Sequence, residues 1–400
     1  MYGGGNIGRG FIGALFSQSD YEVTFIDVAE AVVSELQQKH CYPVRYVCSE
    51  GHEDVLIRNV TAVNGNDTKQ AAMAIAECDI MATAVGARIL KFIIPNIVAG
   101  LRRRWAEGRG PLNIIICENL NDANLIVEKM IKEQLTPEEI GIFDDSVGLV
   151  EASIGRMVPL QTDEMKDGEP LRVCVERYGF LPVDKSAFKG EVPEIKNMVP
   201  SSPFDFFVKR KLFIHNMGHA TTAYLGGIKG VDYIFEAIDD PDIRTIAQNA
   251  MLESALALSK RYGKYLGDIV LHITDLLCRF SNSALKDTCA RVGGDPARKL
   301  APADRMIGAS LTAVSEGITP AYIAVGAAAG VKRYIDETEG LEQGDATARK
   351  VLQDISGLSP EDSLSELICS YYEMLIDGHT IADLRRKADE NKKKSLSNII

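Results

Sequence analysis

The sequence lacks the features of secreted, membrane-spanning and metal-dependent proteins. Its eight cysteines are scattered singly, and none forms a Cys-x-x-Cys pair or a cysteine–histidine cluster at zinc-binding spacing. It contains no signal peptide and no apolar run of about 18 residues, the length that a membrane-spanning helix needs. We therefore expect a cytoplasmic protein with free thiols, no membrane contact and no bound metal ion.

Basic side chains are also scarce. The 44 lysine and arginine residues are outnumbered by 56 aspartate and glutamate residues, which gives a formal net charge of −12. The overall field of such a chain is unsuited to nucleic acid and anionic membranes, so we expect a small-molecule partner. A length of 400 residues exceeds one ordinary hydrophobic core and predicts two domains. We expect a monomer or a small homo-oligomer.

The chain does contain a glycine-rich start. Gly3, Gly5 and Gly8 match the pattern Gly-x-Gly-x-x-Gly, and a helical pattern follows them. In a dinucleotide-binding fold the first glycine makes a tight turn, the second lets the backbone approach a pyrophosphate, and the third lets helix and strand pack closely. The helix N-terminus then faces the phosphate charge. We predict cofactor contacts at Gly3, Gly5, Asn6, Ile7, Gly8 and Arg9.

An acidic residue follows the glycines at the spacing expected for nucleotide recognition. The apolar strand Glu22–Ile26 ends at Asp27, about 20 residues after the loop. A carboxylate at this position hydrogen-bonds the adenosine ribose and repels a 2′-phosphate, so we predict NAD as the cofactor rather than NADP. The alternative is that Asp27 is only a solvated residue at a strand end.

Almost no strand precedes the glycines, because only Met1 and Tyr2 stand before Gly3. The first strand of this fold is normally central, with hydrogen bonds on both of its sides. The sequence therefore suggests that the start codon is assigned too late or that the chain is truncated. We expect the chain as it stands to fold less well and to bind cofactor less tightly than a complete one.

Two further buried strands end in residues that suit a cofactor or a substrate. Ligands of doubly wound sheets bind beyond the carboxyl ends of the strands. We therefore place Thr83, Val85 and Gly86, at the end of one apolar segment, in the cofactor wall. The next buried strand is followed by several amides, among them Asn119, which could hold a substrate or the nicotinamide. They could equally be turn residues or a helix cap.

The stretch Lys211–His219 brings three chemically useful side chains to one side of a predicted helix. At 100° per residue, Lys211, His219 and Asn216 fall at about 0°, 80° and 140°. A buried lysine can act as a general base, an asparagine amide can donate to a developing oxyanion, and a histidine can orient a hydroxyl. The set suits the oxidation of a secondary alcohol. The alternative is an amphipathic helix whose lysine reaches solvent, and we interpret the nearby His215 as a packing residue.

A series of short motifs occurs in order along the chain. They are Gly5-Asn-Ile-Gly-Arg-Gly-Phe11, Thr83-Ala-Val-Gly86, Leu112-Asn-Ile-Ile-Ile-Cys-Glu-Asn119, Arg156-Met-Val-Pro159, Lys211-Leu-Phe-x-x-Asn216-x-Gly-His219, Arg279-Phe-Ser-Asn282 and Arg291-Val-Gly293. In these motifs the chain resembles the polyol-specific long-chain dehydrogenases, the mannitol dehydrogenase family, nearly from end to end. Its length is similar to that of the mannitol-1-phosphate 5-dehydrogenase branch.

The resemblance implies an activity and a role for each residue of the set. The branch interconverts D-mannitol 1-phosphate and D-fructose 6-phosphate with NAD(H) and without a metal ion. Its general base is a lysine, which matches Lys211. Two asparagines polarise the reacting oxygen, and they match Asn216 and Asn119. The histidine of the signature matches His219.

The predicted fold class is α/β, with an N-terminal Rossmann-type doubly wound sheet followed by an all-α C-terminal substrate domain. The NAD-binding domain would span residues 1–195, with its first strand largely missing, and the helical substrate domain residues 196–400. A nearly continuous helical pattern after the helix-start signal Ser202-Pro203 supports the second part. We expect the active site between the two domains.

A phosphorylated sugar needs a positively charged pocket in this acidic chain. We predict substrate contacts at Arg291, which aligns with a substrate-contacting arginine of the family, and at Arg298; Lys299 and Arg305 are further candidates. Gly155 departs from the family, which has an acidic residue there. This leaves open another polyol phosphate or a sugar acid, as in tagaturonate and fructuronate reductases. A non-catalytic NAD-binding protein is the remaining alternative.

Overall fold

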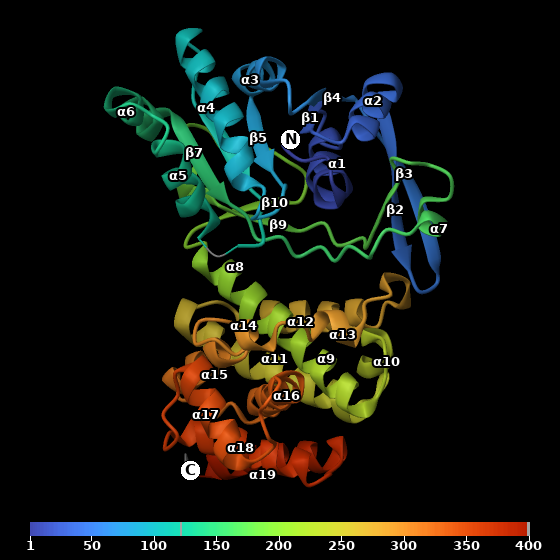
Figure 1. Ribbon diagram of the computed structural model, residues 1–400, viewed down its shortest axis with the longest axis vertical. Coiled ribbons are helices and arrows are strands. Elements are labelled where there is room, and N and C mark those ends of the chain that lie inside the picture. Colours follow the sequence, from blue (N-terminus) through green and yellow to red (C-terminus); the bar gives the residue numbers. More distant parts are fainter. Residues whose placement is uncertain (121, 398–400) are drawn as a thin grey trace. The chain divides into compact units, whose positions relative to one another are not determined.

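The computed structural model describes residues 1–120 and 122–397. The chain forms two compact units, Met1–Asp205 and Phe206–Ile400 (Figure 1). The first is an α/β unit and the second is helical, which confirms the predicted fold class. The units divide later along the chain than the predicted boundary after residue 195. No described helix is both long and apolar enough to span a membrane.

The first unit is organised around a parallel sheet. Its strands are β1 (Val23–Asp27), β4 (Val60–Asn64), β5 (Ile80–Thr83), β6 (Leu112–Ile116) and β7 (Val147–Glu151). β1 pairs with β4, and β6 pairs with both β5 and β7, all in parallel. Tyr2 links the two groups, because it forms parallel bridges to Ile26 on β1 and to Thr83 on β5. The resulting order is β4-β1-Tyr2-β5-β6-β7.

Met1 and Tyr2 therefore stand at the position of a central strand. The Tyr2 amide donates to Ala82 O at 2.8 Å, and the Ile26 amide donates to Met1 O at 2.9 Å. The terminal amino group of Met1 donates to Thr24 O at 2.8 Å, and burial lowers the pKa of this amino group to about 6. These few bonds join the two groups of strands.

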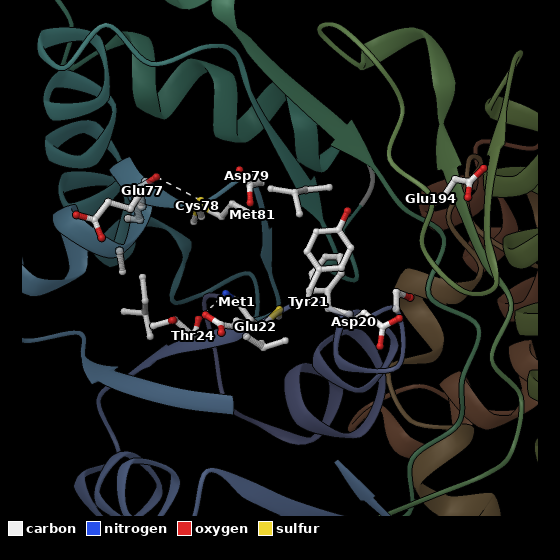
Figure 2. Close-up of a pocket in the computed structure, with 17 residues that line it drawn as sticks. Met1, Asp20, Tyr21, Glu22, Thr24, Glu77, Cys78, Asp79, Met81 and Glu194 are labelled. Atoms are coloured by element: carbon white, nitrogen blue, oxygen red, sulfur yellow. Dashed lines mark hydrogen bonds between the residues drawn. The ribbon is translucent and has the colours of Figure 1, made fainter. Parts of the chain in front are cut away.

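A cavity of about 850 Å³ lies beside Met1 (Figure 2). Glu22 and Thr24 line it from the start of β1, and Asp79 and Met81 line it from the start of β5. Ligands of doubly wound sheets bind beyond the opposite, carboxyl ends of the strands. We therefore do not assign this cavity to the cofactor.

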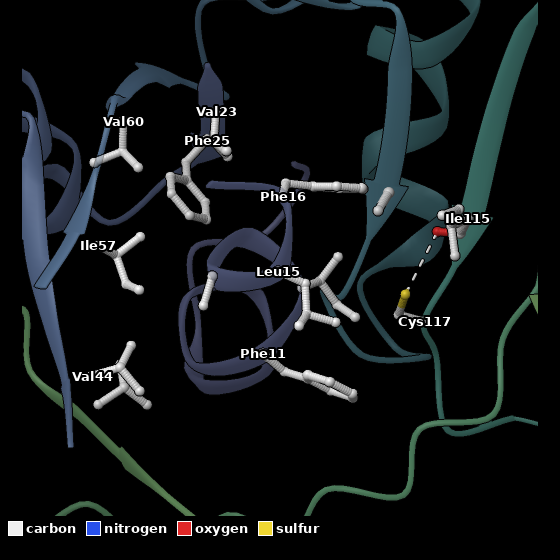
Figure 3. Close-up of a cluster of buried hydrophobic side chains, with 14 of the residues drawn as sticks. Phe11, Leu15, Phe16, Val23, Phe25, Val44, Ile57, Val60, Ile115 and Cys117 are labelled. Atoms are coloured by element: carbon white, nitrogen blue, oxygen red, sulfur yellow. Dashed lines mark hydrogen bonds between the residues drawn. The ribbon is translucent and has the colours of Figure 1, made fainter. Parts of the chain in front are cut away.

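Apolar cores cover both faces of the parallel sheet. Ile115 of β6 packs in one core with Phe11 and Phe25 (Figure 3). Its neighbours Ile114 and Ile116 belong to the core on the other face. Because successive side chains of a strand point to opposite faces, the sheet is covered on both sides, as in a doubly wound fold. The helices of this unit are η1 (Gly8–Ile12), α1 (Gly13–Ser17), α2 (Glu30–Lys39), α3 (Thr68–Glu77), α4 (Leu90–Ala106), α5 (Ala123–Lys132), α6 (Pro137–Ser146), α7 (Asp163–Lys166) and η2 (Lys185–Ala187).

Two smaller sheets complete the first unit. β2 (Cys41–Cys48) and β3 (Gly51–Arg58) form an antiparallel hairpin, and β8 (Val173–Val175) pairs with β2 in parallel. β9 (Leu181–Asp184) and β10 (Met198–Ser201) form a separate parallel pair. Buried residues of β2, β3 and β8 share one core with β1 and η1, so the hairpin is part of the same unit.

The second unit is built from helices that pack around α16. Its helices are α8 (Asp205–Arg210), η3 (Lys211–Asn216), α9 (Met217–Lys229), α10 (Ile234–Asp239), α11 (Pro241–Tyr262), α12 (Leu266–Phe280), η4 (Ser283–Leu285), α13 (Cys289–Val292), α14 (Pro296–Lys299), α15 (Ile307–Ser315), α16 (Ala321–Glu337), α17 (Asp345–Ser356), α18 (Ser363–Ile376) and α19 (Ile381–Ser397). α16 packs against α9, α11 and α18. A Cβ at Gly326 would overlap the Thr221 side chain, so α16 and α9 approach closely. This packing holds α9, the helix that continues from Lys211.

Candidate active site

The glycine-rich loop leaves no room for side chains at its two ends. Gly3 has a φ of +96°, a conformation that favours glycine, and a Cβ there would overlap Ala84 O. A Cβ at Gly8 would overlap Gly3 O. By contrast, a Cβ at Gly5 would meet no atom within 4 Å beyond its chain neighbours. The loop is therefore closed tightly at its ends and open at Gly5, as the approach of a pyrophosphate requires.

Arg9 and Asp27 hold this loop from two sides. The buried Arg9 donates from Nε to Gly4 O at 2.6 Å, and from Nη1 to Leu171 O. Asp27 accepts at Oδ2 from the Gly4 amide at 2.6 Å and at Oδ1 from the Ala29 amide at 2.8 Å. Both side chains thus position the backbone of the loop. A carboxylate oxygen can accept more than one hydrogen bond, so the ribose contact of Asp27 stays a prediction.

The loop after β5 is fixed by a carboxylate from the next strand. Buried Glu118, two residues beyond the end of β6, accepts from the Val85 amide at 3.0 Å and from the Gly86 amide at 2.8 Å. Thr83 is fully buried, and its hydroxyl bonds no other described residue. Sequence reasoning did not single out Glu118, although a carboxylate directly after a buried strand is a signal for such a role.

Two further polar residues lie at the carboxyl edge of the sheet. Asn119 is exposed just after β6. Glu151 ends the neighbouring strand β7, and its pKa is raised to about 7 by burial and then by the charges of Asp122 and Asp184. Glu151 is a titratable group near the predicted substrate-holding amide that the sequence analysis missed.

The stretch that carries Lys211 begins as a π-helix, which the sequence did not predict. η3 (Lys211–Asn216) is inserted between α8 and α9. In a π-helix residue i+5 bonds to residue i, so Asn216 stands one turn along from Lys211 on the same side. The predicted angle of about 140° between them is therefore wrong, because it assumed 3.6 residues per turn throughout. The wider turn brings the two residues closer in angle than an α-helix would.

The surroundings of Lys211 favour a neutral amine. Burial, and then the positive charge of Arg305, lower the pKa of Lys211 to about 8. The Lys211 side chain is half-buried, between a core lysine and one that extends into bulk solvent. The amine can therefore exchange protons near neutral pH.

His219 lies against an aromatic ring and a carboxylate. Its ring stacks on Phe280, with centroids 4.8 Å apart and planes 12° apart. Its Nε2 atom is 3.4 Å from Oδ2 of Asp287. The neighbouring His215 is buried, and burial followed by the charge of Arg279 lowers its pKa well below the usual range. His215 is thus a neutral ring within the packing around His219.

The basic residues differ in what they already bind. Arg291 is exposed and donates from Nε to Asp287 at 2.8 Å. Arg298 is exposed and pairs with aspartates at 2.8 and 3.2 Å. Lys299 is buried, its side-chain amine makes no hydrogen bond or ion pair with any described residue, and its pKa is lowered to about 8 by burial and then by Arg305. Among these three residues, Lys299 is the one whose charged group binds no described partner.

The second unit thus offers an amine, a carboxamide and an imidazole on one continuous helical stretch. Lys211 and Asn216 stand on η3, and His219 follows in the first turn of α9. Such groups can move a proton and stabilise a developing oxyanion. Within residues 1–120 and 122–397, no group of three or more histidine, cysteine, aspartate or glutamate side chains is arranged to hold a metal ion.

Two family models match the chain. The mannitol dehydrogenase Rossmann domain matches residues 1–197, and the mannitol dehydrogenase C-terminal domain matches residues 204–373. The mannitol-1-phosphate 5-dehydrogenase of Bacillus licheniformis is 35% identical over 376 residues, which cover 92% of this chain and 98% of that protein. The enzyme of the same name from Bacillus subtilis is 36% identical over 373 residues, which cover 92% and 97%.

Two solved structures share the fold. D-sorbitol dehydrogenase in substrate-free form has a TM-score of 0.78 at 15% identity, covering 97% of this chain and 93% of that one. The ternary complex of Pseudomonas fluorescens mannitol 2-dehydrogenase with NAD and D-mannitol has a TM-score of 0.71 at 17% identity, covering 96% and 92%. The likeness extends over both units of the chain.

Proposed function

The chain belongs to the mannitol dehydrogenase family of oxidoreductases, and on that premise we propose that it interconverts D-mannitol 1-phosphate and D-fructose 6-phosphate with NAD(H). The observation that carries the proposal is the lowered pKa of Lys211, on the same helical stretch as Asn216 and His219. The Bacillus relatives that bear the name of this activity match the chain over nearly their whole length, which supports the choice of substrate.

Lys211 is the proposed general base. With a pKa of about 8, part of its amine is neutral near neutral pH, where an ordinary lysine is almost fully protonated. The neutral amine takes the proton of the C5 hydroxyl while a hydride leaves the same carbon. In the opposite direction, the ammonium returns this proton to the carbonyl oxygen of the sugar. NAD, when bound, supplies the hydride acceptor.

The amides of Asn216 and Asn119 are proposed to donate to the reacting oxygen. Asn216 stands one π-helical turn from Lys211, so a single oxygen can lie within reach of both groups. Asn119 follows β6 in the first unit, at the carboxyl edge where ligands of such sheets bind. His219 is proposed to orient the hydroxyl before its proton is transferred.

The first unit is proposed to bind NAD mainly through the backbone of its glycine-rich loop. Asn6 is exposed and Ile7 half-buried, so both lie where a pyrophosphate could reach their amides. Asp27 would accept from the adenosine ribose and repel a 2′-phosphate. Thr83 and Gly86 would line the nicotinamide side, with the loop between them held in place by its bonds to Glu118.

The phosphate group of the substrate is proposed to bind at Lys299 and Arg305. Lys299 is buried, its amine makes no hydrogen bond or ion pair with another described residue, and Arg305 lies near enough to lower its pKa. A dianionic phosphate would offset this repulsion with charge-assisted hydrogen bonds. Arg291 and Arg298 stay predicted contacts, but both already bind aspartates.

The direct test is the consumption of NADH with D-fructose 6-phosphate and, in parallel, with D-fructose. We expect rapid consumption only with the phosphorylated sugar, because fructose offers no phosphate for the Lys299 amine and for Arg305, which pairs with Asp304 at 2.8 Å. Equal kcat/KM for the two sugars would contradict the phosphate site. Consumption of NADPH at the same rate would contradict the role of Asp27.

A related enzyme with a different substrate is the second candidate. Gly155 stands where the family has an acidic residue, and a Cβ at this position would lie 3.1 Å from Cε1 of Tyr178. The ring of Tyr178 thus occupies space that a larger side chain would need. A panel of ketose phosphates and of the sugar acids tagaturonate and fructuronate would reveal this alternative. NADH binding without turnover on the whole panel would favour a non-catalytic role.

A further inference from the structure

His219 contacts a carboxylate from a segment that is distant in sequence. Nε2 of His219 lies 3.4 Å from Oδ2 of Asp287, which stands between η4 and α13. The stacking of the imidazole on Phe280 fixes the plane of the ring. The Asp287 carboxylate therefore lies at one edge of the His219 ring, and Phe280 packs against the face of that ring.

Asp287 is itself held at two points. Its carboxylate Oδ1 accepts from Nε of Arg291 at 2.8 Å and also from Nη2 of the same guanidinium. Its backbone carbonyl accepts from the Ile234 amide at 2.9 Å. The remaining carboxylate oxygen, Oδ2, is the one that faces His219.

The carboxylate of Asp287 is ionised. Burial alone would raise the pKa of Asp287, but the contact with His219 and the charge of Arg291 outweigh burial and lower it. An ionised carboxylate only accepts hydrogen bonds. In the neutral imidazole, the nitrogen that faces it must then carry the hydrogen, and the other nitrogen carries a lone pair.

We propose that Asp287 is a positioning residue that keeps the hydrogen of His219 on Nε2, so that Nδ1 accepts a hydrogen bond from the substrate hydroxyl. The inference rests on the proposed function and deepens it. Nε2 of His219 is buried and makes no hydrogen bond with a described residue, so its 3.4 Å contact with Oδ2 of Asp287 is an electrostatic one that favours a hydrogen on the facing nitrogen. In this proposal Arg291 binds Asp287 and keeps its carboxylate in place. This role differs from the substrate contact that the sequence predicted for Arg291.

The variant D287N tests this assignment because the amide is not symmetric. Arg291 can only donate, so it binds the amide oxygen and turns the NH2 group toward Nε2 of His219. Nε2 must then accept, and the ring hydrogen moves to Nδ1. We expect kcat for fructose 6-phosphate to fall about 10- to 100-fold with an unchanged KM for NADH, the usual scale for partners that orient a ligand or a catalytic ring.

The tautomer can be observed directly by nitrogen NMR of the protein labelled with ¹⁵N-histidine, at a pH where the ring is neutral. The variant H219Q assigns the signal. We expect hydrogen on Nε2 in the natural protein and on Nδ1 in D287N. Hydrogen on Nδ1 in the natural protein would overturn the proposal, and this readout remains decisive even if D287N does not fold.

A matched control is available in α17. Asp345 pairs with Arg349 four residues later at 2.8 Å, as Asp287 does with Arg291. D345N therefore makes the same chemical change in the same kind of ion pair, and we expect it to leave kcat unchanged. Equal losses in D345N and D287N would show a general effect on stability.

A double-mutant cycle locates the effect of Asp287. If it acts through His219, D287N in the H219Q background causes no further loss of kcat. An additional loss, or an unchanged kcat in D287N alone, would overturn the proposal. Failure of the natural protein to turn over fructose 6-phosphate would contradict the proposed function instead, while the NMR experiment would still test the tautomer.

Discussion

The two units build their sites from different parts of the chain. In the first unit, the glycine-rich loop offers backbone amides, and the π-helix η1 follows it directly. In the second unit, the π-helix η3 carries Lys211 and Asn216, the side chains proposed to act on the substrate. π-helical turns are rare and occur often at functional sites. The first site requires backbone amides that no side chain covers. The second requires particular side chains in particular surroundings.

Charged residues also serve different ends in the two units. Arg9, Asp27 and Glu118 each bind backbone groups, and they shape the loops that would hold the cofactor. Lys211, which is half-buried, and Lys299, which is buried, both have pKa values lowered by desolvation and then by the charge of Arg305. The first unit thus uses charged side chains to hold its backbone, and the second contains two lysines whose pKa values are lowered.

The largest effect should come from K211A. We expect kcat to fall by about 10²- to 10⁴-fold, the range for losing a general base, with NADH affinity unchanged because the cofactor residues belong to the first unit. Steady-state rates and a fluorescence titration with NADH measure the two quantities. The control K209A removes a lysine that only covers the Phe213 ring at 5.2 Å, and it should keep its kcat. Near-normal turnover in K211A would remove Lys211 from the role of base.

The next effect concerns the phosphate. We expect K299A to raise the KM for fructose 6-phosphate by about 10- to 100-fold, since hydrogen bonds to charged groups contribute about 1.5–3 kcal/mol. R298A should change it less, because Arg298 already pairs with Asp295 and Asp304. The KM for fructose 6-phosphate of the two variants shows which residue binds the phosphate. A larger effect in R298A would restore the prediction made from sequence.

Variants in the glycine-rich loop should change stability and NADH binding, whereas K211A should change kcat. G8A should lower the free energy of unfolding by about 1–3 kcal/mol, because its Cβ would overlap Gly3 O, and it should weaken NADH binding as well. G5A has space for its Cβ, so we expect weaker NADH binding with unchanged stability. Denaturant unfolding and NADH titration separate the two. Unchanged stability of G8A would mean that the loop is not closed as described.

The smallest effect is a dependence on pH. Oxidation of mannitol 1-phosphate needs the neutral amine of Lys211, whose pKa is about 8, so its rate should rise as the pH increases through that value. The change is about tenfold between about pH 7 and 9, from the fraction of neutral base. Reduction of fructose 6-phosphate needs the ammonium and should change in the opposite sense. The same pH dependence in both directions would contradict this base.

Two local ion pairs could have been predicted from the sequence but were not. Asp287 stands four residues before Arg291, and Asp295 three before Arg298, which are the spacings of ion pairs within a helical turn. These spacings signal that both arginines have partners. Spacing does not single out Lys299, because Asp295 stands four residues before it, and only the structure shows that Asp295 pairs with Arg298.

The sequence by itself determined the features that depend on local spacing. The Gly3–Gly8 pattern, the acidic residue at the end of β1 and the Lys211–His219 stretch are each defined by neighbours along one strand, loop or helix. The alternation of apolar strands and helices likewise indicated the α/β unit, and the long helical pattern indicated the second unit. The predicted NAD-binding and catalytic contacts at these positions stay predictions that the variants above test.

Only the tertiary structure decided which groups meet across the chain. It placed Tyr2 between β1 and β5, turned η3 into a π-helix and brought Asp287 to His219. Periodicity cannot supply such contacts, because hydrogen bonds and ion pairs depend on distance in space and on burial. A helix pattern assumes 3.6 residues per turn, and the packing of α9 within the second unit, not the pattern, sets the real geometry.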